Sequence, residues 1–247
     1  MIREGDRVAI GVSGGKGSQA LLDALLLLQR KSPIRYSLHA FTVEQGKLVR
    51  PIEPLGDYMK ARGIEWIYYR DEPSFSLLAE QPDHGCDLCS RYRRRAVYDI
   101  ASELGANVVA LGHTQDDFCE ALLRNTLYTG RLSMLPAVTH SRSGDFRLIR
   151  PLVYVSEDVT VSYAEQKSIP ITPCGCSHKT GTVREKVRGF LAETKRENPH
   201  VLENILSALQ HIDTPRLLDR RFLDQDPEEP AAPTAGDPLP VLVEEIL

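Results

Sequence analysis

The chain has 247 residues, of which 42% are hydrophobic and 26% are charged. This is the composition of an ordinary soluble globular protein with room for one large core. The longest apolar run, 20–28, contains Asp23 and is too short to cross a bilayer. Charged residues at 3–7 stand where the apolar part of a signal peptide would begin, so we expect a cytoplasmic protein with reduced cysteines.

The net charge of −4 is unevenly distributed along the chain. The stretch 224–247 holds seven acidic residues and no basic one, and its removal leaves 30 basic against 27 acidic residues. A mildly basic body of this kind is compatible with nucleic acid without requiring it. We expect a domain over 1–212, followed at 213–247 by an acidic, proline-rich and disordered tail.

Strand-like and helix-like patterns alternate in chain order. Strand 7–12 precedes helix 18–29, strand 36–43 precedes helix 54–62, and strand 65–69 precedes helix 90–104. Strand 107–111 precedes helix 116–128, and strand 148–151 precedes helices 156–167, 182–197 and 200–210. This alternation predicts an α/β fold with a parallel five-stranded sheet, helices on both faces and a helical C-terminal part.

A glycine-rich turn separates the first strand from the first helix. Its residues are candidates for binding phosphate, because the backbone N–H groups of such a turn and the helix N-terminus attract anions. The sequence of this turn matches neither the P-loop motif nor the glycine motif of dinucleotide-binding proteins. A tight turn that binds nothing is the alternative. The candidate residues are Ser13, Gly14, Gly15, Lys16 and Ser18.

Four of the five cysteines form two close pairs, Cys86-Asp-Leu-Cys89 and Cys174-Gly-Cys176. Close pairs of thiolates can converge on one metal ion or cluster. Spacing alone favours a structural zinc site, with an iron–sulfur cluster second, a redox pair third and unligated thiols as the remaining alternative. Cys119 lies at a core position of a predicted helix and is expected to be simply buried.

Basic side chains follow the first cysteine pair at Arg91, Arg93, Arg94 and Arg95, with Tyr92 among them. They lie in the first turns of a helix, where the helix dipole disfavours cations. Two interpretations stand side by side. The arginines form either a solvated helix face or a surface that contacts an RNA backbone, with Tyr92 able to stack on a base.

The motif Gly112-His113-Thr114-Gln115-Asp116-Asp117, with Glu120, follows the fourth strand. Because parallel strands end at the same rim of a sheet, we expect Gly112 and His113 to lie beside the glycine-rich turn. The acids can simply cap the next helix. They can also hold Mg²⁺ that bridges the phosphates of ATP.

In this order, these elements resemble the tRNA 2-thiocytidine synthetase family of ATP pyrophosphatases. Its members share a Ser-Gly-Gly-x-Asp-Ser loop, C-x-x-C before an arginine-rich helix, Gly-His-x-x-Asp-Asp-x-x-Glu-Thr, Arg-Pro-Leu and Pro-Cys-x-x-Cys. The corresponding stretches here are 13–18, 86–95, 112–121, 150–152 and 173–176. The resemblance covers roughly residues 1–223 and excludes only the tail.

The resemblance implies an adenine nucleotide alpha-hydrolase-like fold and an ATP-dependent tRNA sulfurtransferase. ATP with Mg²⁺ would adenylate O2 of a cytidine, and a [4Fe–4S] cluster would carry the sulfide that displaces AMP. The implied cluster ligands are Cys86, Cys89 and Cys174. Implied partners are tRNA, a sulfur donor such as a cysteine desulfurase, and a second copy of the chain, since family members often dimerise.

Further roles follow from the same resemblance. Asp116, Asp117, Cys174 and Cys176 take the catalytic positions. ATP and pyrophosphate would be bound by Ser13, Gly14, Gly15, Lys16, Ser18, Gly112 and His113. The tRNA would contact Arg91, Arg93, Arg94 and Arg95.

The chain departs from the family pattern at several positions. Gly17 replaces the aspartate of the loop, and Cys174-Gly-Cys176 is one residue shorter than the family's pair, so Cys176 is an alternative third ligand. With Asp116 or Asp117 replacing the lost acid, the chain would be a sulfurtransferase, and Gly17→Asp is expected to raise turnover. The alternatives are an ATP-independent [4Fe–4S] desulfidase and an impaired family member with a structural metal.

Overall fold

The computed structural model describes residues 1–46, 48, 50–81, 86–141, 144–172 and 182–219, without the side chains of Leu78, Cys86 and Asp87. The chain divides into two compact units between residues 205 and 206. The division falls inside α8 (Val201–Gln210), ahead of the boundary at 212 that the sequence predicts. No helix in the described ranges is long and apolar enough to cross a membrane. Most of the predicted tail lies outside these ranges.

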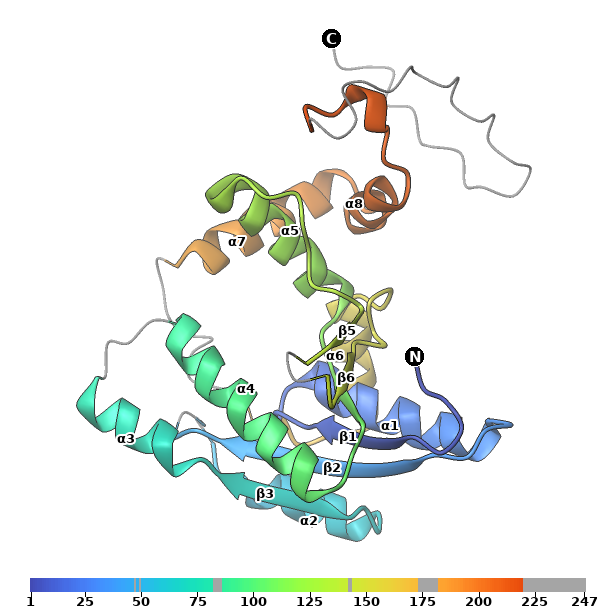
Figure 1. Cartoon of the computed structure of the whole chain (residues 1–247), viewed down its shortest axis with the longest axis vertical. Helices are drawn as coiled ribbons and strands as arrows, with labels where there is room; N and C mark the ends of the chain where they lie inside the picture. The colour runs from blue at the N-terminus through green and yellow to red at the C-terminus, as the bar shows by residue number, and fades with distance from the viewer. Residues whose placement is uncertain (47, 49, 82–85, 142–143, 173–181, 220–247) are drawn as a thin grey trace. The chain divides into compact units, whose positions relative to one another are not determined.

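A mostly parallel sheet forms the centre of the first unit (Figure 1). Its six strands run in the order β3-β2-β1-β4-β6-β5, and only β5 is antiparallel to its neighbour. All five strands predicted from the sequence are present, which confirms the α/β class. The strands are β1 (Arg7–Gly11), β2 (Ser37–Glu44), β3 (Trp66–Arg70), β4 (Val108–Leu111), β5 (Val138–His140) and β6 (Arg147–Ile149).

The predicted number of strands was wrong by one. The additional strand β5 is three residues long, and its side chains are exposed or half-buried, so it carries no periodic apolar signal. One helix was also missed, α3 (Glu72–Glu80), which begins just before Pro73 at a position where proline is tolerated. The six-stranded sheet therefore has a short antiparallel edge that the sequence pattern does not reveal.

Helices cover both faces of the sheet, as the alternation predicts. Val8 and Ile10 of β1 pack in one core cluster with Leu21, and Ala9 between them packs in the other with Ile100. Both faces of this central strand are therefore buried, which is typical of a parallel sheet. The remaining helices are α1 (Lys16–Lys31), α2 (Glu53–Ala61), α4 (Cys86–Glu103), α5 (Gln115–Thr129), α6 (Glu157–Gln166), α7 (Val183–Glu197) and the short 3₁₀ helix Thr214–Arg216.

The direction of the strand order reverses between β1 and β4. From β1 the chain proceeds to β2 and β3 on one side, and β4 then pairs with the other edge of β1. Ligands of open α/β sheets bind beyond the carboxyl ends of the strands at such a reversal. The glycine-rich turn and the turn at 112–114 begin there, as the sequence predicts.

Candidate functional site

The glycine-rich turn is held by its own side chains and by a neighbouring segment. The Ser13 backbone N–H donates to Ser18 Oγ at 3.1 Å, and Ser18 Oγ–H donates to the Gly15 carbonyl at 2.8 Å. Gly14 has a φ of +80°, and a Cβ on it would lie 2.6 Å from the Thr172 carbonyl oxygen. The Thr172 N–H donates back to the Gly14 carbonyl at 3.0 Å. The turn therefore needs glycine at position 14.

The N-terminus of α1 opens directly from this turn. Its N-cap is Gly15, no side chain caps the helix, and its first turn contains no acidic residue. Uncapped N–H groups and the helix dipole favour an anion at this end, and Lys16 adds a cation in the same turn. The arrangement fits the phosphate role predicted for residues 13–18.

Gly17 lies against the turn that follows β4. A Cβ on Gly17 would be 2.5 Å from the Gly112 carbonyl oxygen and 3.3 Å from Thr114 Cγ2. A Cβ on Gly112 would be 2.6 Å from both the backbone nitrogen and the Cα of Ser18. The two backbones therefore touch, and neither position has room for a side chain. This geometry argues against our expectation that Gly17→Asp improves the enzyme.

The acids of the second motif all have protein partners. Asp117 caps α5, since its Oδ2 accepts the Thr114 N–H at 3.0 Å, and its Oδ1 pairs with Arg184 Nη2 at 2.8 Å. Asp116 Oδ2 accepts the backbone N–H of Glu157, at the start of α6, at 2.6 Å. The capping interpretation therefore describes Asp117, and Asp116 ties α5 to α6.

Glu120, which is 5% exposed, receives two guanidinium groups from α7. Arg184 Nε lies 3.0 Å from Glu120 Oε2, and Arg188 Nε lies 2.6 Å from Glu120 Oε1. Burial of a carboxylate is tolerated when it is paired in this way. Sequence reasoning missed both arginines, although their spacing of four residues on one helix face was a usable signal.

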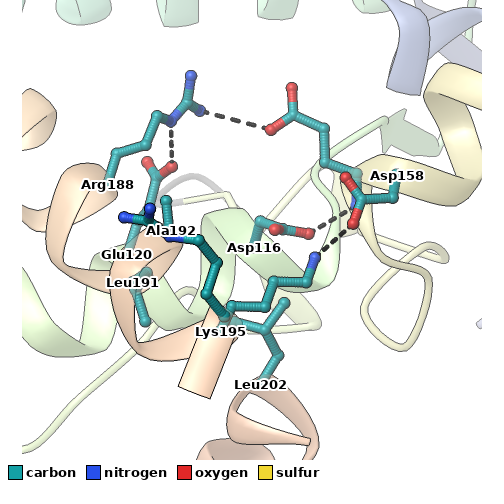
Figure 2. A pocket seen from close by; sticks show the side chains of 10 residues that line it. Asp116, Glu120, Asp158, Arg188, Leu191, Ala192, Lys195 and Leu202 are labelled. Atoms are coloured by element: carbon teal, nitrogen blue, oxygen red, sulfur yellow. Dashed lines mark hydrogen bonds and ion pairs between the residues drawn. The ribbon is translucent and has the colours of Figure 1, made fainter. Parts of the chain in front are cut away.

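A cavity of about 280 Å³ lies beside this ion-pair network. In Figure 2, Asp116 and Glu120 of α5 and Asp158 of α6 surround it together with Arg188 and Lys195 of α7. Lys195 Nζ lies 2.5 Å from Asp158 Oδ2, and this hydrogen bond raises the pKa of Lys195. The cavity walls are thus held by paired charges from three helices.

His113 lies next to this acid cluster at the carboxyl end of β4. The pKa of His113 is lowered to about 4, mainly by burial; Asp117 opposes this shift, and the nearby cations Arg150, Arg184 and Arg93 contribute to it. The imidazole is therefore neutral at pH 7. Nδ1 of His113 and Nε of Arg150 are buried and make no hydrogen bond to the described residues. These orphaned groups are available to a ligand.

The first cysteine pair begins α4, four residues earlier than the helix predicted from the sequence. Cys86 is its first residue, and Cys89 follows one turn later on the same face. Cys89 is buried, and its thiol donates to Gln45 Oε1 at 3.7 Å. Cys174 and Cys176 lie outside the described residues.

The four arginines of α4 are all exposed, but they have different neighbours. Arg95 Nη2 pairs at 2.7 Å with Asp71, which is fully buried, so this arginine holds α4 to the start of α3. Burial is the main cause that lowers the pKa of Arg150, and the charge of Arg94 adds to it. The charge of Arg93 contributes in the same way to the lowered pKa of His113, which is also due mainly to burial.

Cys119 is fully buried, as predicted, and its thiol donates to the Leu202 carbonyl at 3.7 Å. Burial raises the pKa of this thiol to about 12, with smaller contributions from Asp116, Glu203 and Glu120. A thiol that stays protonated is neither a nucleophile nor a metal ligand. This cysteine belongs to the core.

Relatives of the chain were found among proteins of known activity. The tRNA-cytidine(32) 2-sulfurtransferase of Tolumonas auensis is 39% identical over 228 residues, which is 91% of this chain and 75% of that protein. The protein of that name from Anaeromyxobacter sp. (strain K) is 35% identical over an alignment of 258 positions, which covers 96% of this chain and 88% of that protein. The chain belongs to the tRNA-cytidine(32) 2-sulfurtransferase family.

Similarity to a solved structure supports the fold of this family member. The U34-tRNA thiolase NcsA from Methanococcus maripaludis, determined with its [4Fe–4S] cluster, superposes with a TM-score of 0.63 at 22% identity. The superposition covers 86% of this chain and 74% of that one. At this identity only the fold is shared with certainty. No family sequence profile matches the chain.

Proposed function

We propose that this chain transfers sulfur to C2 of a cytidine in tRNA, as the name of its relatives describes, and that ATP drives the transfer. The observation that carries the proposal is the likeness to 2-sulfurtransferases over nine-tenths of the chain. That likeness spans the phosphate loop, the 112–120 motif and the start of α4, which lie around one rim of the sheet. The reaction belongs in the cytoplasm, with tRNA.

The first step activates the base. Cytidine O2 attacks the α-phosphorus of ATP, and the bond to the bridging oxygen breaks to release pyrophosphate. We assign the leaving pyrophosphate to the turn at Ser13, Gly14, Gly15 and Lys16, where backbone N–H groups stabilise its growing charge. Ser18 keeps the turn in shape through its two hydrogen bonds.

Side chains on the β4 side of the crevice provide polar contacts. Neutral His113 has one nitrogen without a partner among the described residues and can accept or donate a hydrogen bond to the nucleotide. Gly112 can contact the nucleotide through its backbone. Asp117 orients the turn by capping α5, and Asp116 ties α5 to α6. We therefore treat the two aspartates as positioning residues of the site.

The cysteines fit a cluster of iron and sulfide. Cys86 and Cys89 stand one turn apart at the start of α4, and thiolates are the ligands that such clusters prefer. We propose that they and Cys174 hold a [4Fe–4S] cluster, with Cys176 as the alternative third ligand. When bound, such a cluster offers an iron without a protein ligand, from which sulfur reaches C2 as AMP leaves.

The tRNA requires a cationic surface near the cysteines. We assign its phosphates to Arg91, Arg93 and Arg94, which are exposed on α4. Arg95 supports that surface from its ion pair with Asp71. The sulfur itself would come from a donor protein such as a cysteine desulfurase, and a second copy of the chain can complete the assembly.

Nucleoside analysis of tRNA tests the proposal. The anaerobically purified protein, with its metal content measured, is incubated with unmodified tRNA, ATP, a reductant and sulfide. We expect 2-thiocytidine and one AMP for each base converted. Sulfide release from thiolated tRNA without nucleotide would instead make the chain a desulfidase. If the protein contains zinc but no iron and forms no 2-thiocytidine, the cysteines hold a structural metal instead.

A further inference from the structure

The segment between β4 and β5 leaves the sheet and returns to it. α5 begins at Gln115, just after β4, and its 15 residues form a rod about 22 Å long. Figure 1 shows the chain coming back from the far end of α5 to β5, which begins at Val138. We call the turn at that far end, residues 127–133, the α5 tip. The tip is separated from the 112–117 motif by the length of the helix.

Hydrogen bonds fix the shape of the α5 tip. Gly130 ends the helix in the left-handed conformation, with a φ of +64°. The backbone N–H groups of Gly130 and Arg131 both donate to the Asn125 carbonyl. The Asn125 side chain also donates from Nδ2 to the Ser133 carbonyl at 2.9 Å. The tip is therefore a defined turn built around one asparagine.

The returning part of the chain is attached to the sheet. Arg150 directly follows β6, the neighbour of β4, and is 9% exposed. Its backbone N–H donates to the Ala137 carbonyl at 2.9 Å, and its Nη1 donates to the Pro136 carbonyl at 2.6 Å. β4 and β6 are parallel, so both ends of the segment that carries the tip are held at the carboxyl rim of the sheet.

The α5 tip exposes apolar and cationic side chains together. Its exposed apolar side chains are Leu127 at 65%, Tyr128 at 51% and Leu132 at 58%. Arg131 in the tip and Arg124, one turn before it, are also exposed. The sequence contains no acidic residue from 121 to 144. Large apolar side chains that an ordered surface keeps in water mark a site for a macromolecule, and the unbalanced cations favour an anionic one.

We propose that the α5 tip binds the RNA substrate, as a contact surface separate from the arginines of α4. Arg124 and Arg131 neutralise backbone phosphates, and Tyr128 stacks on an unpaired base, as exposed aromatic side chains do in RNA recognition. Because a tRNA is far longer than α5, one molecule can occupy the rim and the tip at once. This role rests on the proposed activity on tRNA.

The charge of the tip favours RNA over a second copy of the chain. In a twofold dimer the same patch of each copy meets its equivalent. Arg124 and Arg131 would then face the same two arginines across the interface, without an acidic residue in the segment to pair with them. Phosphates remove this repulsion, whereas a second copy would add to it.

Binding of fluorescently labelled, unmodified tRNA to the full chain, measured by anisotropy over a series of salt concentrations, tests the proposal. Tyr128→Ser should weaken binding about tenfold because base stacking is lost, and Tyr128→Phe should bind as the parent does. Arg131→Gln should weaken binding and lower the slope of log Kd against log salt by about 1. Arg30→Gln removes an exposed cation in the last turn of α1 and is the matched control, which should bind as the parent does.

The outcomes separate this role from the proposed function. Affinities equal to that of the parent in folded Tyr128→Ser and Arg131→Gln proteins overturn the role of the tip and leave the activity on tRNA intact. If these variants bind tRNA as the parent does but sediment as a smaller species, the tip is an interface between two copies, and its role in RNA binding is overturned. A parent protein that binds no tRNA overturns both the role of the tip and the proposed function.

Discussion

Gly17 and Gly112 come from turns that follow different strands, yet their backbones meet without space for a Cβ on either residue. A Cβ on Gly17 would reach 2.5 Å from the Gly112 carbonyl oxygen, and a Cβ on Gly112 would reach 2.6 Å from the Ser18 nitrogen. This contact sets the distance between the phosphate loop and the 112–117 motif. It explains why both positions hold glycine.

Substitution of Gly17 should therefore destabilise the protein. We expect Gly17→Ala to cost about 1–3 kcal/mol in urea unfolding, and Gly17→Asp at least as much, because the turn at Gly112 must shift to admit the side chain. Neither variant should raise ATP-dependent turnover.

Gly189→Ala is the control for helix propensity. Gly189 lies in α7, and a Cβ there would meet nothing within 4 Å. This change should stabilise the protein by about 0.5–1 kcal/mol. Faster turnover of a Gly17→Asp enzyme with unchanged stability would contradict the packing argument.

His113 should make stability depend on pH. Its pKa is about 4 in the folded protein, mainly through burial, against about 6.5 in an unfolded chain. The unfolded state therefore binds a proton more readily between these values. Stability due to this group is complete above pH 6.5 and falls as pH drops toward 4, by at most about 3 kcal/mol.

Urea unfolding of the parent and of His113→Asn between pH 7.5 and pH 5 measures this contribution. The asparagine variant cannot titrate, so its stability should fall less steeply with decreasing pH than that of the parent. Equal slopes for the two proteins would show that the imidazole is not the titrating group.

Glu120 should contribute more to the stability of the fold than an exposed helix residue does. It is buried and pairs with Arg184 and Arg188, so Glu120→Gln should cost about 2 kcal/mol in urea unfolding through loss of charge-assisted contacts. Asp99→Asn is the matched change at an exposed ion pair, where Arg95 Nε lies 3.7 Å away. This control should lose less than about 0.5 kcal/mol. Similar losses in both variants would contradict the buried network.

The cluster ligands can be tested by colour and iron content. Cys89→Ser should abolish the brown colour and the iron of anaerobically purified protein, because a ligand is replaced by a poorly coordinating hydroxyl. Cys119→Ala should keep both, since Cys119 is a protonated core thiol. Full iron in folded Cys89→Ser protein would exclude it from the ligand set.

Local patterns were sufficient for the framework of the fold. Apolar strands, the glycine-rich turn and the 112–120 motif are short-range signals, and the rule for strand reversals places both turns at one rim. The pairing of Glu120 with Arg184 and Arg188 could not be predicted because it joins helices far apart in the sequence. The Gly17–Gly112 contact was hidden for the same reason. β5 lacks any apolar face that a pattern could detect.

The most direct test of ATP-driven thiolation follows the oxygen that sulfur replaces. A tRNA anticodon stem-loop carrying oxygen-18 at O2 of the target cytidine is incubated with the iron-loaded protein, ATP and sulfide, and the AMP is analysed by mass spectrometry. If ATP activates O2, the label appears in AMP, one atom for each 2-thiocytidine formed. Unlabelled AMP, or 2-thiocytidine formed without ATP, would contradict the account.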